Sequence, residues 1–298
     1  MTDSIVIFRT VSEYRNWRNS LPNNTSIGFV PTMGALHQGH LSLVSQSLKE
    51  NTFTVISIFV NPSQFAPNED LNSYPRTFTQ DLELLSNLNI EGKSVNAIFA
   101  PTVLEMYPSG IDLDINKQQG AFVSVLGVSE QLEGQTRPNF FRGVATVVTK
   151  LFNAIQPTVA YFGQKDIQQT IVLKRMVKDL LIPIEIKVLP IIRESNGLAL
   201  SSRNAYLSDE LRENSSLIYK ALKEGESAFK NGKSRDEILS IITKILLKNE
   251  QFKIDYISLA DKETLQEIDD LSNGAILSIA IYVTENERTT RLIDNIIL

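Results

Sequence analysis

The sequence predicts an α/β protein with a parallel central sheet and a smaller α+β domain at its C-terminal end. Over the first two-thirds of the 298 residues, short apolar runs alternate with amphipathic helical stretches. Such alternation favours parallel strands joined by right-handed crossovers. The run 53–60 is β-branched and apolar on both faces, as a buried parallel strand is. Beyond Pro190, two polar amphipathic helices precede the strands. We therefore expect domains at 1–190 and 191–298.

The elements of the first domain follow from periodicity. Short apolar runs that end in turns predict strands at 26–30, 53–60, 96–100, 158–163 and 184–189. Apolar residues at helical spacing predict helices at 40–49, 79–88, 143–155 and 167–181. The order of these elements predicts a Rossmann-like, doubly wound sheet.

The C-terminal domain is expected to hold helices at about 208–231 and 234–249, strands near 253–259 and 275–283, and a final apolar segment. The stretch 191–208 has few linker features and could belong to either domain. The insert-like stretch 89–96 is expected to be a surface loop.

Composition and charge argue against several classes of protein. Lys and Arg number 29 against 34 Asp and Glu, a formal charge of −5 without a basic stripe, so we expect no nucleic-acid partner. No apolar run approaches the ~20 residues of a membrane-spanning helix. Asp3 stands where a secretory signal would be basic, and cysteine is absent. We expect a cytoplasmic protein without disulfide or thiolate chemistry.

The only two histidines, His37 and His40, lie on a glycine-bearing turn after the first expected strand. Gly34 and Gly39 permit tight turns and close approach of a ligand. His40 is expected to open a helix, whose N-terminus favours anions. Imidazole, with a reference pKa of ~6.5, can donate hydrogen bonds to phosphate. We favour phosphate binding over two alternatives, which are histidines that cap backbone groups and a zinc site without further ligands.

Three more polar stretches follow expected strands, whose carboxyl ends share one edge of a parallel sheet. Asn61 and Gln64 could bind a hydroxyl or a carboxylate, although Asn-Pro is also common turn chemistry. Gly163 and Lys165 suit phosphate binding, without the P-loop pattern, or form a generic loop. The stretch 200–204 has the hydroxyls and guanidinium of a loop that closes on polyphosphate, or of a solvated turn.

Together these stretches resemble the pantoate–β-alanine ligase (pantothenate synthetase) family. The motifs are PTMGALHQGHLSLV, FVNPSQF, DLNSYPRT, LEGQTRPNFFRGVATVV, YFGQKDIQQ and GLALSSRNAYL, in the family's order. They cover residues 26–208 densely, and the C-terminal third matches in length and pattern. The HxGH turn alone would indicate only the wider nucleotidyltransferase superfamily that includes class I aminoacyl-tRNA synthetases.

The resemblance implies an ATP-dependent condensation. ATP and (R)-pantoate form a pantoyl adenylate with release of pyrophosphate, and β-alanine then displaces AMP to give pantothenate. It further implies Mg²⁺ as a cofactor and a homodimer formed through the N-terminal domain.

The resemblance also implies roles for residues. His40 matches a proton donor, although stabilisation of transition-state charge explains the same position, and His37 matches a phosphate contact. The implied catalytic set is His37, His40, Lys165, Ser201, Ser202 and Arg203. The implied ATP-binding set is Met33, Gly34, Ala35, Leu36, His37, Gln38, Gly39, His40, Gly163, Gln164, Lys165, Asp166, Ile192, Leu200, Ser201, Ser202 and Arg203.

Substrate and metal contacts complete the implied site. Gln64 and Gln169 match glutamines that hold pantoate, Gln64 lies near the β-alanine site as well, and Asn61 joins this neutral set. Asp81 is the candidate protein ligand of Mg²⁺, where some family members carry consecutive acidic residues and this chain has Gln80 before it. Leu200 replaces a methionine that is frequent in the family, which is a mild apolar exchange.

The sequence argues against two other functions. A nucleotidyltransferase that acts on a phosphorylated substrate should need an extra basic group, which the neutral amides do not supply. A catalytically silent nucleotide-binding homologue would be free to lose the histidines, Lys165 and the loop 201–203, all of which are intact.

Overall fold

The computed structural model describes residues 5–67, 69 and 71–298. The chain forms two compact units. The first comprises Met1–Gly163 and Gln169–Leu189, and the second comprises Gln164–Gln168 and Pro190–Leu298. These units differ from the expected domains, 1–190 and 191–298, chiefly in the short segment 164–168.

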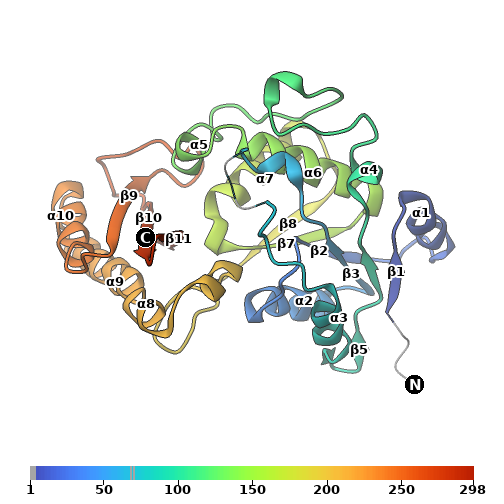
Figure 1. Cartoon of the computed structure of the whole chain (residues 1–298), viewed down its shortest axis with the longest axis horizontal. Coiled ribbons are helices and arrows are strands. Elements are labelled where there is room, and N and C mark those ends of the chain that lie inside the picture. The colour runs from blue at the N-terminus through green and yellow to red at the C-terminus, as the bar shows by residue number, and fades with distance from the viewer. Residues whose placement is uncertain (1–4, 68, 70) are drawn as a thin grey trace. The chain divides into compact units, whose positions relative to one another are not determined.

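The first unit is built on a six-stranded parallel sheet, as expected (Figure 1). Its strands, in spatial order, are β1 (Val6–Phe8), β6 (Ala97–Phe99), β3 (Phe53–Ile58), β2 (Ile27–Thr32), β7 (Val159–Gly163) and β8 (Glu185–Leu189). The chain proceeds from β2 outward to β3 and β6, and then from β7 outward to β8 on the other side. The sheet therefore reverses its winding between β2 and β7, the place where such folds bind ligands.

Helices cover both faces of this sheet, which makes it doubly wound. The helices along this part of the chain are α1 (Val11–Ser20), α2 (Gln38–Glu50), α3 (Phe78–Ser86), α4 (Val103–Met106), α5 (Glu133–Thr136), α6 (Phe140–Ile155) and α7 (Ile167–Asp179), of which α5 packs on α6. Because strand side chains alternate between faces, Val30 packs with Val44 of α2, whereas its neighbour Phe29 contacts Phe152 of α6 at 6.5 Å between ring centroids.

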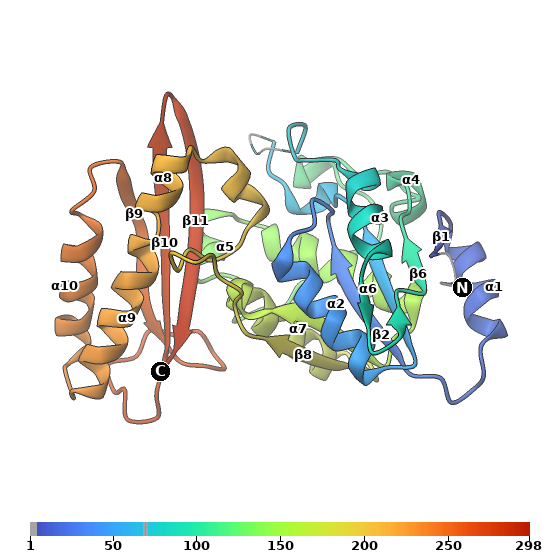
Figure 2. The same ribbon diagram turned by 90° about the horizontal axis from the view of Figure 1, so that it is seen from below.

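The second unit is an antiparallel sheet covered by helices. Its strands run in the order β11 (Arg288–Ile297), β10 (Ile276–Glu285) and β9 (Phe252–Ala260). Its helices are α8 (Asp209–Asn214), α9 (Leu217–Lys230) and α10 (Arg235–Leu246). Figure 2 shows α9 and α10 side by side on one face of the sheet, where Leu222, Ile242 and Leu277 form part of a buried core.

Local chemistry explains where the expected elements differ from the observed ones. The helix expected over 208–231 is two helices, α8 and α9, with a break at Ser215 and Ser216, where the Ser215 hydroxyl donates to the Leu211 carbonyl at 2.7 Å. The loop expected over 89–96 contains a small hairpin of β4 (Asn89–Ile90) and β5 (Lys93–Ser94). Glu91 and Gly92, with φ of 54° and 83°, make its two-residue turn. The final apolar segment is the end of β11, and β1 and α1 were not foreseen.

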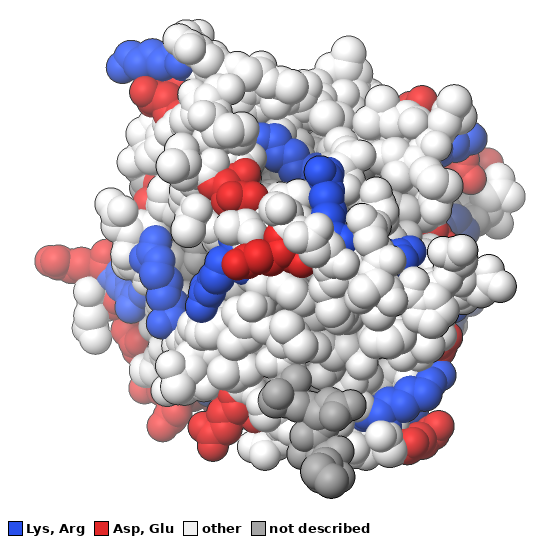
Figure 3. Space-filling model, turned by 90° about the vertical axis from the view of Figure 1, so that its right-hand side faces the viewer, with Lys and Arg blue, Asp and Glu red and all other residues white. Residues whose placement is uncertain are grey.

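Charged side chains are interspersed on the surface. On the face in Figure 3, acidic and basic groups alternate around broad uncharged areas. Among the described residues, no helix has both the length and the apolar character to cross a bilayer.

Candidate active site

A buried carboxylate accepts hydrogen bonds from the turn that follows β2. Asp81, in α3, is 1% exposed. Its Oδ2 accepts the Ala35 N–H at 3.0 Å and its Oδ1 accepts the Leu36 N–H at 2.8 Å. Ala35 has φ of 50° and Gly34 has φ of 87°, so two successive residues adopt the left-handed region. The two N–H···carboxylate bonds offset both the strain of this backbone conformation and the cost of burying the charge of Asp81.

This use of Asp81 bears on the metal. Both of its oxygens accept backbone N–H groups, and Oδ1 also accepts the Thr77 hydroxyl at 3.2 Å. In the described part of the chain, no group of three or more His, Asp or Glu could hold a metal ion. The residues here do not fit a magnesium site built by the protein alone.

The two histidines cap the start of α2 reciprocally. The helix begins at Gln38, so the expectation that His40 opens it is wrong: His37 is the N-cap and His40 the third helical residue. His37 Nδ1 accepts the Gly39 N–H at 3.1 Å, and His40 Nδ1 accepts the His37 N–H at 3.4 Å. The capping bonds expected under the structural alternative are therefore present, and phosphate binding stays a prediction.

Capping also sets the protons on the two rings. A ring nitrogen that accepts a hydrogen bond carries no proton, so the neutral form of each histidine has its proton on Nε2. The ring centroids of His37 and His40 lie 4.1 Å apart. Even without a positive charge, both rings are therefore hydrogen-bond donors through Nε2. Capping uses Nδ1 of each ring, whereas the phosphate contact that the sequence predicts would use Nε2.

The expected neutral amides are joined to one another after β3. Asn61 is 1% exposed, and its Nδ2 donates to Gln64 Oε1 at 2.9 Å. Asn61 Oδ1 accepts the hydroxyls of Tyr107 at 2.6 Å and Ser63 at 3.1 Å. Burial raises the pKa of Tyr107 to about 12, so this hydroxyl keeps its proton. Asn61 thus orients Gln64, whose side chain is only half-buried.

Sequence reasoning missed two residues that shape this region. Arg137 donates to the Gln64 carbonyl at 3.3 Å, forms two 2.7 Å bonds with Glu69, and stacks on Phe140. Gly143 of α6 lies so close to the 3₁₀ turn Pro62–Gln64 that a Cβ would be 2.2 Å from the Ser63 carbonyl oxygen. The available signal was a glycine inside a helical pattern, which often marks close packing.

Two further candidates of the first unit, Gly163 and Gln169, flank the segment 164–168. Gly163 is the last residue of β7, which pairs with β2 in parallel register. The strands that precede the two expected ATP-binding turns are therefore neighbours. Gln169 is half-buried in the first turn of α7, whereas the adjacent Gln168 is 3% exposed.

The other nucleotide-binding candidates belong to the second unit. Lys165 is half-buried, with its Nζ 3.9 Å from the exposed Asp166 carboxylate. The Ile192 carbonyl accepts the Leu200 N–H at 3.0 Å, so the expected adenine contact and the expected phosphate loop are tied together. Ser201 caps the 3₁₀ turn Ser202–Tyr206 by accepting the Arg203 N–H at 3.2 Å.

Comparison with known proteins agrees with this geometry. A model of the pantoate–β-alanine ligase family matches residues 6–297. The chain is 53% identical to the pantoate–β-alanine ligase of Saccharomyces cerevisiae over 98% of its own length and 99% of the relative's. It is 45% identical to the pantothenate synthetase of Herpetosiphon aurantiacus, with the same coverage.

Solved structures give the same answer. The crystal structure of pantothenate synthetase from Thermus thermophilus superposes with a TM-score of 0.87 at 42% identity, over 98% of this chain and 99% of that one. The ligase from Francisella tularensis, solved with a βγ-ATP ligand and β-alanine, gives 0.77 at 33% identity, over 98% and 97%. The chain therefore belongs to the pantoate–β-alanine ligase family.

Proposed function

We propose that this enzyme condenses (R)-pantoate with β-alanine and converts ATP to AMP and pyrophosphate. A pantoate carboxylate oxygen attacks the α-phosphorus of ATP, and the bond to pyrophosphate breaks. The β-alanine amine then attacks the acyl carbonyl of the pantoyl adenylate, loses a proton, and AMP leaves. The observation that carries the proposal is the turn 33–40, where capping presents two Nε2–H donors after β2.

Charge stabilisation by positioned donors is the main contribution of the protein. His37 and His40 donate through Nε2 to phosphate oxygens as negative charge develops on the departing pyrophosphate. Lys165 and the loop 201–203 neutralise the same charge. His40 does not need to transfer a proton for this, because a neutral donor already lowers the barrier.

The acid is selected by neutral groups. Gln64 and Gln169 bind the hydroxyl and carboxylate of pantoate, and Asn61 fixes the amide of Gln64 rather than contacting substrate. Neutral amides bind the carboxylate without forming an ion pair that would make it a poorer nucleophile. This division explains why the side chains near Asn61 are hydroxyls and amides.

Magnesium fits this scheme as a companion of ATP. Mg²⁺ usually binds through substrate phosphates with few protein ligands, and it neutralises their charge. We therefore infer that it enters with the triphosphate, while Asp81 holds the histidine turn.

We infer the remaining organisation from the family. Residues 1–190 would bind ATP and pantoate, and residues 191–298 would form a lid. The enzyme would act as a homodimer in the cytoplasm.

The test is a reconstituted reaction. The protein is mixed with Mg-ATP, pantoate and β-alanine, and AMP and pantothenate are measured. We expect both products in equal amounts. When β-alanine is left out, Mg-ATP and pantoate should still release pyrophosphate. Folded, ATP-binding protein that forms no AMP in response to β-alanine would exclude the ligase.

A further inference from the structure

Two adjacent buried polar residues lie near the end of β11, the last strand of the second unit. Asp294 and Asn295 are each 2% exposed. Successive side chains of a strand point to opposite faces. Asp294 shares its face with Leu292 and Ile296, which pack in the helix-covered core. Asn295 lies on the other face, so the pair reaches two different segments.

Asp294 fixes the segment after Ile192. Its carboxylate makes two bonds with the Arg193 guanidinium, at 2.5 and 2.9 Å, and Arg193 also donates to the Gly197 carbonyl at 3.1 Å. The guanidinium stacks on Tyr219 at 3.8 Å. A bidentate pair of this kind fixes position as well as charge.

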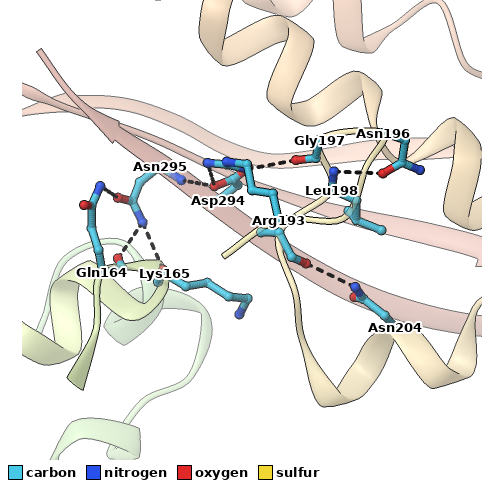
Figure 4. A network of polar contacts seen from close by, with 10 residues as sticks. Gln164, Lys165, Arg193, Asn196, Gly197, Leu198, Asn204, Asp294 and Asn295 are labelled. Carbon is cyan, nitrogen blue, oxygen red and sulfur yellow. Dashed lines mark hydrogen bonds and ion pairs between the residues drawn. The ribbon is translucent and has the colours of Figure 1, made fainter. Parts of the chain in front are cut away.

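Asn295 fixes the segment that carries Lys165. Its Nδ2 donates to two successive carbonyls, those of Gln164 at 2.9 Å and Lys165 at 3.0 Å. Its Oδ1 accepts Gln164 Nε2 at 3.2 Å. Figure 4 shows both carbonyls directed at this one amide, with the Lys165 side chain extending away from it. A single side chain thus uses three hydrogen bonds on two residues.

Peptide geometry gives these bonds a directional consequence. Each trans peptide is planar, with its C=O and N–H pointing in opposite directions, and the described chain has no cis peptide. When the carbonyls of Gln164 and Lys165 point at Asn295, the N–H groups of Lys165 and Asp166 point away from β11. These are the donors that lead into α7, where anions are favoured.

We propose that Asn295 is a positioning residue for ATP phosphate binding, because it fixes the backbone from which Lys165 and these N–H groups project. The proposal rests on the phosphate-binding role of Lys165. It assigns a part in nucleotide binding to the last strand of the chain, 130 residues from the lysine that Asn295 positions.

The experiment compares Asn295→Asp and Asn295→Ser with a matched control. The aspartate variant keeps the size but cannot donate, and its charge would face two carbonyl oxygens. The serine variant keeps one short donor and tests the idea if the aspartate variant does not fold. Asn249→Asp makes the same change where the side chain only accepts a bond, from the Gln251 N–H. Each variant is also made with Lys165→Ala.

We expect the KM for ATP to rise about tenfold or more in Asn295→Asp, equivalent to ~1.4 kcal/mol, and less in Asn295→Ser. The KM for pantoate should be unchanged in both Asn295 variants. The control variant Asn249→Asp should keep the wild-type KM for ATP. In the Lys165→Ala background, the effect of either Asn295 variant should become smaller, because only the part that acts through the backbone N–H groups remains.

Other outcomes overturn the idea in distinguishable ways. Equal changes in the KM for ATP and pantoate, or an undiminished effect in the Lys165→Ala background, would reduce Asn295 to a general structural role. A Lys165→Ala variant with unchanged ATP affinity would refute the role of Lys165, and this proposal with it. Adenylation by the wild-type protein is measured in parallel. If the wild type is active, a negative result for Asn295 or Lys165 refutes the role of that residue and not the proposed function.

Discussion

The turns 33–40 and 164–166 are fixed in opposite ways. In the first, the carboxylate of Asp81 accepts two successive N–H groups. In the second, the amide of Asn295 donates to two successive carbonyls. In both, one buried side chain from a distant element controls two consecutive peptides. Under the proposed function, the first turn binds its ligand through the side-chain donors of the two histidines, whereas the second can also direct backbone N–H groups outward.

The largest expected effect is at His40, where this contrast is sharpest. Asn can still accept the His37 N–H and so preserve the cap, but it removes the Nε2 donor. We expect His40→Asn to lower kcat about 10²–10³-fold, the usual effect of losing one charge-stabilising donor. Its circular dichroism and melting temperature should remain those of wild type. Near-normal turnover in His40→Asn would show that the His40 imidazole caps the helix and has no part in catalysis.

Breaking the first anchor should affect both stability and rate. Asp81→Ala leaves the buried Leu36 N–H and the half-buried Ala35 N–H without their acceptor, and a buried unsatisfied group costs about 1–3 kcal/mol in the free energy of unfolding. Displacement of the histidines should lower kcat/KM by about 10²-fold. Urea unfolding and steady-state kinetics measure the two effects. If Mg²⁺ dependence shifts while stability stays constant, Asp81 is a metal ligand after all.

A change outside both turns should separate acid recognition from nucleotide recognition. Gln64→Ala removes the amide that Asn61 orients, so we expect the KM for pantoate to rise about tenfold. The KM for ATP should stay the same. Gln251→Ala, at an exposed position in the second unit, is the control. An ATP-specific defect in Gln64→Ala would contradict the division proposed here.

The smallest effect is expected at the far end of α2. Glu50 accepts bonds from the Tyr161 hydroxyl at 2.6 Å and Lys187 Nζ at 2.9 Å, which lower its pKa from 4.5 to about 2. A carboxyl group whose pKa is lower in the folded state than in the unfolded state stabilises the fold at pH values above its unfolded pKa. This stabilisation is lost as the pH falls through the folded pKa.

We therefore expect Glu50→Gln to lower stability by about 1 kcal/mol at neutral pH, because the pair is partly solvated. The difference from wild type should shrink between pH 4.5 and about 2. Denaturant titrations across this range measure it, and catalysis at neutral pH should be unaffected. A constant difference down to pH 2 would mean that charge is not the cause.

Local pattern was sufficient for much of the fold. The apolar runs predicted the strands β2, β3, β6 and β7 because burial on both faces leaves a clear signature. The edge strand β8 was predicted as well, although it is only partly buried. Periodicity also placed α6 and α7. It could not place the start of α2, because a histidine at an N-cap is not a preferred cap residue. The three residues of β1 were too few to show a pattern.

The site was predictable where its chemistry is local and not where it is long-range. Glycines and histidines marked the turn 33–40 directly. Nothing near Asp81 indicates that its partners lie 45 and 46 residues away, and Asn295 is more distant still from Gln164. Arg137 was likewise inside a recognised motif without a visible partner. Such residues are defined by tertiary contacts that sequence spacing does not encode.

The placement of 164–168 with the second unit has a practical consequence for protein engineering. A chimaera joined at residue 190 would combine the 164–168 segment of one parent with the β11 of the other. It would then depend on an asparagine in that β11, at the position that donates to the carbonyls of 164 and 165. A graft that carries 164–168 together with 190–298 keeps donor and carbonyls from the same parent. The natural module for exchange is therefore discontinuous in sequence.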